Sequence, residues 1–224
     1  MDEEVQSIHE HMKGLGLGAL AHANWHANYY SMENQWWSEL SVLQAAHAAE
    51  ILIKAKIAEV HPLLIFERLP KASLEDGSLL SLEELIEGGR TFQFSELPDR
   101  LWATTGIKLP NIQRYNTFGR LRNSIQHFSA PKNIDISEEV LLFIYDVIDP
   151  LINNCWGLFA IDFNEDDEPY RYLIDGLVRR GIKFLVSRDC LSELDVNELE
   201  WAEGSIQYKV EMLERFKVAG ALSN

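Results

Sequence analysis

Residues 110–128 have the sequence PNIQRYNTFGRLRNSIQHF, and the fold prediction rests mainly on them. Its apolar side chains recur three or four residues apart, the spacing of one face of an α-helix. They are Ile112, Tyr115, Phe118, Leu121, Ile125 and Phe128. We expect Pro110 at the first helical position and the end of the helix at Ser129-Ala130-Pro131. The stretch therefore predicts an amphipathic helix that packs this face into a helical core.

The sequence around this stretch also favours helices. An Ala-rich run without Gly or Pro predicts a long helix over residues 33–60. Ser81, with Glu84 three residues later, predicts a capping box at the start of a short helix. A similar helix is expected over residues 95–104. Ser137 is expected to cap an apolar helix over residues 140–156, kinked at Pro150.

The C-terminal part of the chain has weaker patterns. We expect a helix over residues 170–180, a short strand or more helix over 182–186, and a helical region over 191–217 broken near Gly204. The acidic run 164–168 is predicted to be a linker. The fold class is therefore all-α. The predicted domains are an N-terminal extension over 1–32, a helical domain over 33–160, and a linker with a C-terminal appendage over 161–224.

Composition limits the function classes. The net charge is -15, and the two cysteines, Cys155 and Cys190, make no disulfide framework. No apolar run is long enough for a bilayer span and no secretory signal is recognised, so we expect a cytoplasmic protein without membrane contact. No spacing of ligands predicts a metal site. Residues 14–18, Gly-Leu-Gly-Leu-Gly, lack the context of a nucleotide loop and are expected to be a flexible hinge, so no cofactor is predicted.

The charge distribution nevertheless favours a local anion site. From Arg100 to Ile134 the sequence has no Asp or Glu and carries six basic side chains, whereas the remaining chain has 14 basic and 35 acidic residues. A polyanion such as RNA requires a basic surface of this kind. The arginines here include Arg114, Arg120 and Arg122.

The same window contains Arg122-Asn123 and, four residues after the asparagine, His127. Histidine suits proton transfer because its pKa lies near neutrality, and arginine donates paired hydrogen bonds to phosphate. Asn123 and His127 share a helix face, while Arg122 lies roughly 140° around the axis from His127. These residues are therefore candidates for phosphate binding and proton transfer.

This motif, at the end of an amphipathic helix that follows a long Ala-rich helix, resembles the HEPN superfamily. The resemblance covers residues 33–160 and implies a bundle of about four or five helices. It implies a metal-independent endoribonuclease with Arg122 and His127 as catalytic residues and Asn123 assisting. Arg120 and Arg114 are then candidates for RNA phosphate binding. Glu50 occupies a position where the family often holds a polar residue facing the motif, or else forms a solvated pair with Lys54.

The resemblance further implies a homodimer whose two motifs form one composite site. It implies a toxin-antitoxin or phage-defence role, with an antitoxin or nucleotidyltransferase as a further partner, and RNA rather than DNA as substrate. Two alternatives stay open. One is a non-catalytic HEPN-like module that binds a nucleotide, RNA or a protein. The other is a helical adaptor that uses the Trp-rich N-terminal region.

Overall fold

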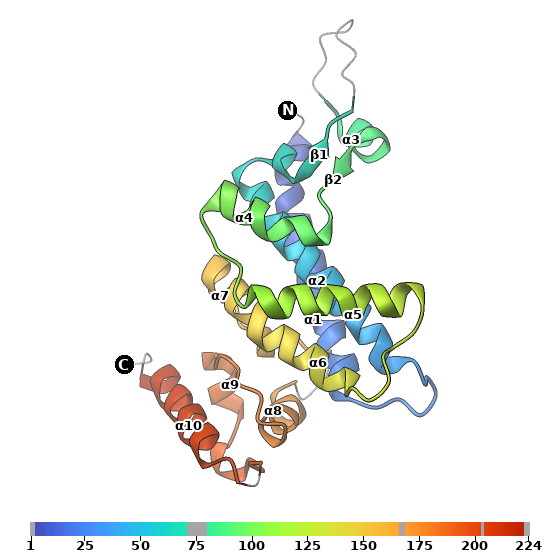
Figure 1. The fold of residues 1–224 in the computed structure, drawn as a ribbon. Helices are drawn as coiled ribbons and strands as arrows, with labels where there is room; N and C mark the ends of the chain where they lie inside the picture. The colour runs from blue at the N-terminus through green and yellow to red at the C-terminus, as the bar shows by residue number, and fades with distance from the viewer. Residues whose placement is uncertain (1–2, 71–79, 166–168, 203, 222–224) are drawn as a thin grey trace, which may run out of the picture. The chain divides into compact units, whose positions relative to one another are not determined.

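A computed structural model describes residues 3–70, 80–165, 169–202 and 204–221. The chain is mostly helical, as the all-α prediction states, and the described residues include one sheet of two very short strands (Figure 1). Two compact units are present. Unit 1 consists of Met1–Leu17 and Ala48–Leu109, and unit 2 consists of Gly18–His47 and Pro110–Asn224. The predicted domain boundaries near residues 32 and 160 stay predictions.

Unit 1 combines the beginning of α1 (Glu3–Asn28) with the end of α2 (Trp37–Val60). Its shorter elements are η1 (Pro62–Ile65), β1 (Phe66–Arg68), α3 (Leu82–Gly88), β2 (Arg90–Thr91), η2 (Phe94–Glu96) and α4 (Leu97–Thr105). Strands β1 and β2 pair antiparallel. The capping box at Ser81 is confirmed, because its hydroxyl accepts from the Glu84 N–H and the Glu84 carboxylate accepts from the Ser81 N–H.

The glycine run over residues 14–18 lies inside α1 instead of in a connecting segment, and the boundary between the two units falls within the run, between Leu17 and Gly18. A hinge at this point stays a prediction. Packing explains the glycine at position 16. A Cβ added to Gly16 would lie 2.7 Å from Cγ of Leu52 in α2, which is closer than carbon atoms pack. The missing side chain therefore lets α1 and α2 approach each other closely.

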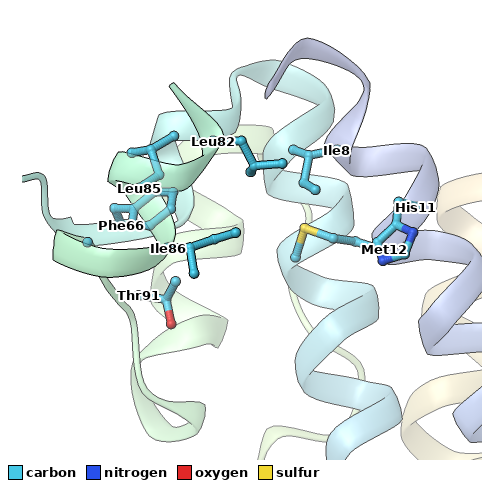
Figure 2. A pocket seen from close by; sticks show the side chains of 9 residues that line it. Ile8, His11, Met12, Phe66, Leu82, Leu85, Ile86 and Thr91 are labelled. Carbon is cyan, nitrogen blue, oxygen red and sulfur yellow. The ribbon is translucent and has the colours of Figure 1, made fainter. Parts of the chain in front are cut away.

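An apolar pocket of about 550 Å³ lies between the beginning of α1 and α3 (Figure 2). Ile8 and Met12 line it from α1, and Leu82, Leu85 and Ile86 line it from α3. No described helix of the chain is both long and apolar enough to cross a membrane.

Unit 2 contains the end of α1, the beginning of α2 and the elements after Pro110. These are α5 (Ile112–His127), α6 (Ile136–Phe143), a π-helical turn η3 (Ile144–Ile148), α7 (Asp149–Trp156), η4 (Ala160–Asp162), α8 (Pro169–Arg179), α9 (Arg188–Glu193), η5 (Val196–Glu198) and α10 (Ile206–Ala221). Figure 1 shows α5 lying across α6.

The end of α1 belongs to the buried interior of unit 2. Asn24 is fully buried and donates to the carbonyls of Ala160 and Phe163, at 3.0 and 2.8 Å. Its amide oxygen accepts from the Tyr145 hydroxyl at 3.1 Å. Helix α2 begins at Trp37 rather than Glu33, because the Asn34 side chain accepts from the Trp36 N–H and holds a local turn.

The apolar helix predicted over 140–156 is the buried centre of unit 2. Its inward side chains, among them Leu141, Phe143 and Ile148, are fully buried. Asp135 rather than Ser137 caps it, because the Asp135 carboxylate accepts from the Glu138 N–H while the Ser137 hydroxyl contacts Ser38. Pro150, where a kink is predicted, lies two residues after the π-helical turn η3. Because proline has no N–H, it cannot donate a hydrogen bond to that turn, and the regular α-helical pattern is interrupted there.

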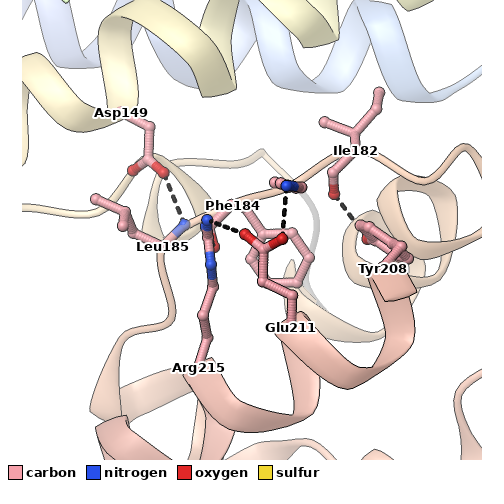
Figure 3. Close-up of polar contacts among 8 residues, drawn as sticks. Asp149, Ile182, Phe184, Leu185, Tyr208, Glu211 and Arg215 are labelled. Atoms are coloured by element: carbon pink, nitrogen blue, oxygen red, sulfur yellow. Dashed lines mark hydrogen bonds and ion pairs between the residues drawn. The ribbon is translucent and has the colours of Figure 1, made fainter. Parts of the chain in front are cut away.

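Residues 182–186 form neither of the expected structures, because side chains rather than a strand partner satisfy their backbone. The carboxylate of fully buried Asp149 accepts from Leu185 N–H at 2.9 Å and from Ala160 N–H at 2.8 Å. Arg215 donates to the Phe184 carbonyl at 2.7 Å (Figure 3). Burial raises the pKa of Asp149 to about 7, although both backbone hydrogen bonds oppose this shift.

The remaining C-terminal elements follow the predicted helices with shifted ends. Helix α8 corresponds to the helix expected over 170–180, and α9 and α10 lie within or around the region expected over 191–217. Gly204 has a φ of 78°, a left-handed conformation that suits the predicted break before α10. Residues 166–168 of the predicted acidic linker lie outside the described residues.

Candidate functional site

The candidate site lies on α5, whose beginning is fixed by an asparagine cap. The Asn111 side chain accepts from the Arg114 N–H at 3.3 Å, and Asn111 itself has a left-handed φ of 43°. Asparagine tolerates this conformation better than most residues and is a favoured helix cap. Helix α5 therefore begins at Ile112, and Pro110 precedes the cap instead of occupying the predicted first helical position.

The end of α5 is closed by hydrogen bonds around one serine. The Ser124 carbonyl accepts from the N–H groups of Phe128 and Ser129, at 2.8 and 3.0 Å. The Ser124 hydroxyl donates to the Ser129 carbonyl at 2.9 Å. These bonds end the helix at His127, next to the predicted stop, and fix the backbone on both sides of Phe128.

The inner face of α5 is buried only along its centre. Tyr115, Phe118 and Leu121 are buried, and the Phe118 ring stacks on Phe143 at 3.8 Å between centroids with 2° between the planes. The two ends of the predicted apolar face differ from expectation, since Ile112 is 42% exposed and Phe128 is 89% exposed. Packing against α6 and η3 therefore anchors α5 by its middle.

The motif side chains lie on the outer side of this anchored helix. Arg122 is half-buried, and Asn123 and His127 are exposed. Arg122 Nη1 donates to Asn123 Oδ1 at 3.1 Å, so the asparagine oxygen orients the guanidinium. His127 lies one turn after Asn123, in the last turn of the helix.

The other two arginines of α5 have different environments. Arg114 lies between two carboxylates, with Nε 2.8 Å from Asp146 and Nη1 3.5 Å from Glu139. These ion pairs join α5 to the helix beneath it and occupy the guanidinium. Arg120 is exposed and donates to the Thr117 hydroxyl at 2.9 Å within the same helix. Arg120 is thus the better placed of the two for contact with a ligand phosphate.

Glu50 belongs to unit 1 and pairs with Lys54 at 2.6 Å between Oε1 and Nζ. Lys54 Nζ also donates to the Thr91 hydroxyl at 3.1 Å. The pair predicted from the four-residue spacing is therefore present, but Lys54 is buried rather than solvated. Its burial joins α2 to β2. A restraint of Arg122 by Glu50 stays a prediction.

The chemistry available at the outer face of α5 is that of phosphate binding and proton transfer. A guanidinium, a carboxamide and an imidazole lie within two turns, in a stretch of sequence without carboxylates. Among the described residues no group of three or more His, Cys, Asp or Glu side chains is arranged to hold a metal ion. The sequence pattern did not identify Ser124, whose hydroxyl donates to the carbonyl of Ser129, five residues later. The one signal that could have identified it was the position of a serine one turn before the end of the helix.

No family model, curated protein or solved structure matches the chain.

Proposed function

We propose that this protein is a metal-independent endoribonuclease that acts as a homodimer. The observation that carries the proposal is the hydrogen bond from Arg122 to Asn123 beside exposed His127, on a helix without acidic residues. Phosphate recognition and proton transfer are the two capacities that RNA cleavage requires, and these three side chains supply both.

The order of helices along the chain supports a HEPN-like bundle for the proposed nuclease. The long Ala-rich helix α2 comes first, the motif helix α5 follows after a variable middle region, and the apolar helix of α6, η3 and α7 comes next. Anchoring by Phe118 on Phe143 holds the inner face of α5 and leaves its polar face outward. The motif therefore lies on a rigid element, as a catalytic group requires.

In the proposed reaction the ribose 2'-oxygen attacks the adjacent phosphorus. A base removes the 2'-OH proton, the bond from phosphorus to the 5'-oxygen breaks, and an acid protonates the departing 5'-oxygen. The products are a 2',3'-cyclic phosphate and a 5'-hydroxyl end. Arg122 binds the non-bridging phosphate oxygens, Asn123 orients Arg122, and His127 transfers a proton.

Two proton transfers occur in this reaction, whereas one chain supplies one motif histidine. A second copy with its α5 facing the first would supply the second histidine and a second arginine. The exposed apolar side chain of Ile112 at the beginning of α5 supports such a contact, since large apolar groups are usually covered in an interface. The homodimer is therefore part of the proposal.

The charge of the chain restricts how RNA approaches. A net charge of -15 repels polyanions over most of the surface, so RNA binds along the basic stretch that includes Arg120 and Arg122. Binding is expected to weaken as salt rises. DNA lacks the attacking 2'-oxygen and is not a substrate. A cytoplasmic toxin or phage-defence role, with an antitoxin or nucleotidyltransferase partner, completes the proposal.

The test is incubation of the purified protein with total cellular RNA in EDTA. Wild type is expected to cut, and His127→Ala and Arg122→Ala are expected to lose at least about a hundredfold in rate, because general acid-base and phosphate contacts each contribute this much. His9→Ala is a matched control, since His9 lies on α1 in unit 1 and outside the motif. Circular dichroism and dimer mass must be unchanged in every variant.

Equal cleavage by wild type and both motif variants would refute the assignment of the site. No cleavage by any of them, with inhibitor and activator excluded, would favour a non-catalytic module that binds RNA, a nucleotide or a protein through the same motif.

A further inference from the structure

Phe128 follows the proposed catalytic histidine directly and is 89% exposed. A phenylalanine this exposed stabilises the fold of its own chain very little, since the gain from an apolar side chain comes from burial. The ring is therefore available to a ligand at the end of α5. In the chain it lies one residue from His127, the residue proposed to transfer a proton.

The backbone that carries this ring is held firmly. The Phe128 N–H donates to the Ser124 carbonyl, and the next residue, Ser129, is bound to Ser124 through both its N–H and its carbonyl. An aromatic side chain has only two rotatable bonds, so a ring on a fixed backbone loses little entropy when a flat ligand stacks on it. The helix end thus presents a preorganised flat apolar surface.

The charge of the sequence stretch that contains this ring favours a polyanionic ligand. Arg122 precedes Phe128 by six residues, roughly 9 Å along the helix, and Arg120 lies within the same stretch. No acidic residue occurs from Arg100 to Ile134. An exposed aromatic ring at the end of a helix that carries arginines matches a nucleotide, whose base stacks on aromatic rings and whose phosphate binds arginine.

We propose that Phe128 is a stacking platform for an unpaired base of single-stranded RNA next to the cleaved linkage. A base in a duplex has both faces covered by its neighbours, whereas a base in a single strand offers a free face. The proposed site therefore selects unpaired RNA. This inference rests on the proposed function for the identity of the ligand, and its test uses RNA that cannot be cut.

The test is binding of fluorescein-labelled 2'-O-methyl oligoadenylate, followed by fluorescence anisotropy. The methyl group blocks the attacking oxygen, so affinity is measured without cleavage. Phe128→Ala is expected to bind about tenfold more weakly or worse, Phe128→Leu to resemble Phe128→Ala, and Phe128→Trp to bind at least as tightly as wild type. With the oligonucleotide hybridised to its complement, wild type and Phe128→Ala are expected to bind alike.

Tyr172→Ala is the control, because it removes an aromatic ring that is also exposed, at 52%, from α8 in the same unit. Its affinity for the oligonucleotide should equal that of wild type. Light scattering in each variant reports the dimer mass.

Three results would overturn the proposal: wild-type affinity in Phe128→Ala, full affinity in Phe128→Leu, or a lower dimer mass in Phe128→Ala, which would make Phe128 a subunit contact. The proposed nuclease fails separately. If Phe128→Ala loses binding and wild type does not cut RNA, stacking is supported and catalysis is rejected. If cleavage depends on His127 and Phe128→Ala binds as wild type does, catalysis is supported and stacking is rejected.

Discussion

Replacement of Asp149 by Asn should change how the stability of the protein depends on pH. Asp149 is fully buried, and its two oxygens accept hydrogen bonds from the N–H groups of Ala160 and Leu185. Desolvation raises its pKa from an ordinary value of 3.8 to about 7, with nearby Arg215 opposing the shift and Asp162 adding to it. The amide of Asp149→Asn does not titrate, so this contribution disappears in the variant.

The sign of the effect follows from proton binding. Asp149 binds its proton more tightly in the folded chain than in the unfolded chain, so the folded state carries the extra proton between the two pKa values. The free energy of unfolding therefore falls as pH rises from about 4 to about 7 and is level above that. A shift of about three units corresponds to about 4 kcal/mol, of which about 3 kcal/mol falls above roughly pH 5.

The measurement is urea unfolding of wild type and Asp149→Asn, followed by tryptophan fluorescence, at several pH values from about 5 to about 8. The difference between the two proteins cancels the titration of groups that they share. Wild type should gain about 3 kcal/mol relative to the variant as pH falls across this range. Parallel curves, with a constant difference at every pH, would refute the assignment of a raised pKa to Asp149.

Three further substitutions test the packing described above. Gly16→Ala should destabilise the protein by about 1–3 kcal/mol, because the new methyl group meets Leu52; a thermal melt with an unchanged midpoint would contradict this close approach. Phe118→Ala should cost about 3–5 kcal/mol in urea unfolding, since it removes a buried ring stacked on Phe143, and an effect under about 1 kcal/mol would rule out this anchor for α5. Arg114→Ala should lower stability by about 1 kcal/mol and leave RNA affinity unchanged, because its charge is paired with carboxylates; a large loss of RNA affinity would show instead that Arg114 contacts phosphate.

Local signals in the sequence predicted helices well where a cap or an uninterrupted apolar pattern specified them. The capping box at Ser81, the end of α5 before Ser129 and the buried helix after Val140 needed only neighbouring residues. Helix starts were predicted less well. Asn111 and Asp135 rather than Pro110 and Ser137 determine two of them, because several capping residues occur close together and packing selects one.

The candidate site could be located on one helix from sequence, since side chains four residues apart necessarily share a face. The polar contacts of its side chains could not be predicted from the sequence. Arg114 and Arg120 look alike in sequence, yet one is paired with carboxylates of the helix beneath and the other is exposed. Phe128 fits the apolar pattern of the core but is exposed at the end of α5.

The helical character, the position of α5 and the residues on its outer face could therefore be predicted from the sequence, because these depend on contacts within a few residues along the chain. Whether each of those residues is buried, paired or exposed depends on contacts between segments that are distant in sequence, and these become visible in the folded chain. The same distinction explains residues 182–186, whose apolar pattern predicted a regular element. Their backbone instead bonds to Asp149 and Arg215, which lie more than 25 residues away in sequence and come close only after folding.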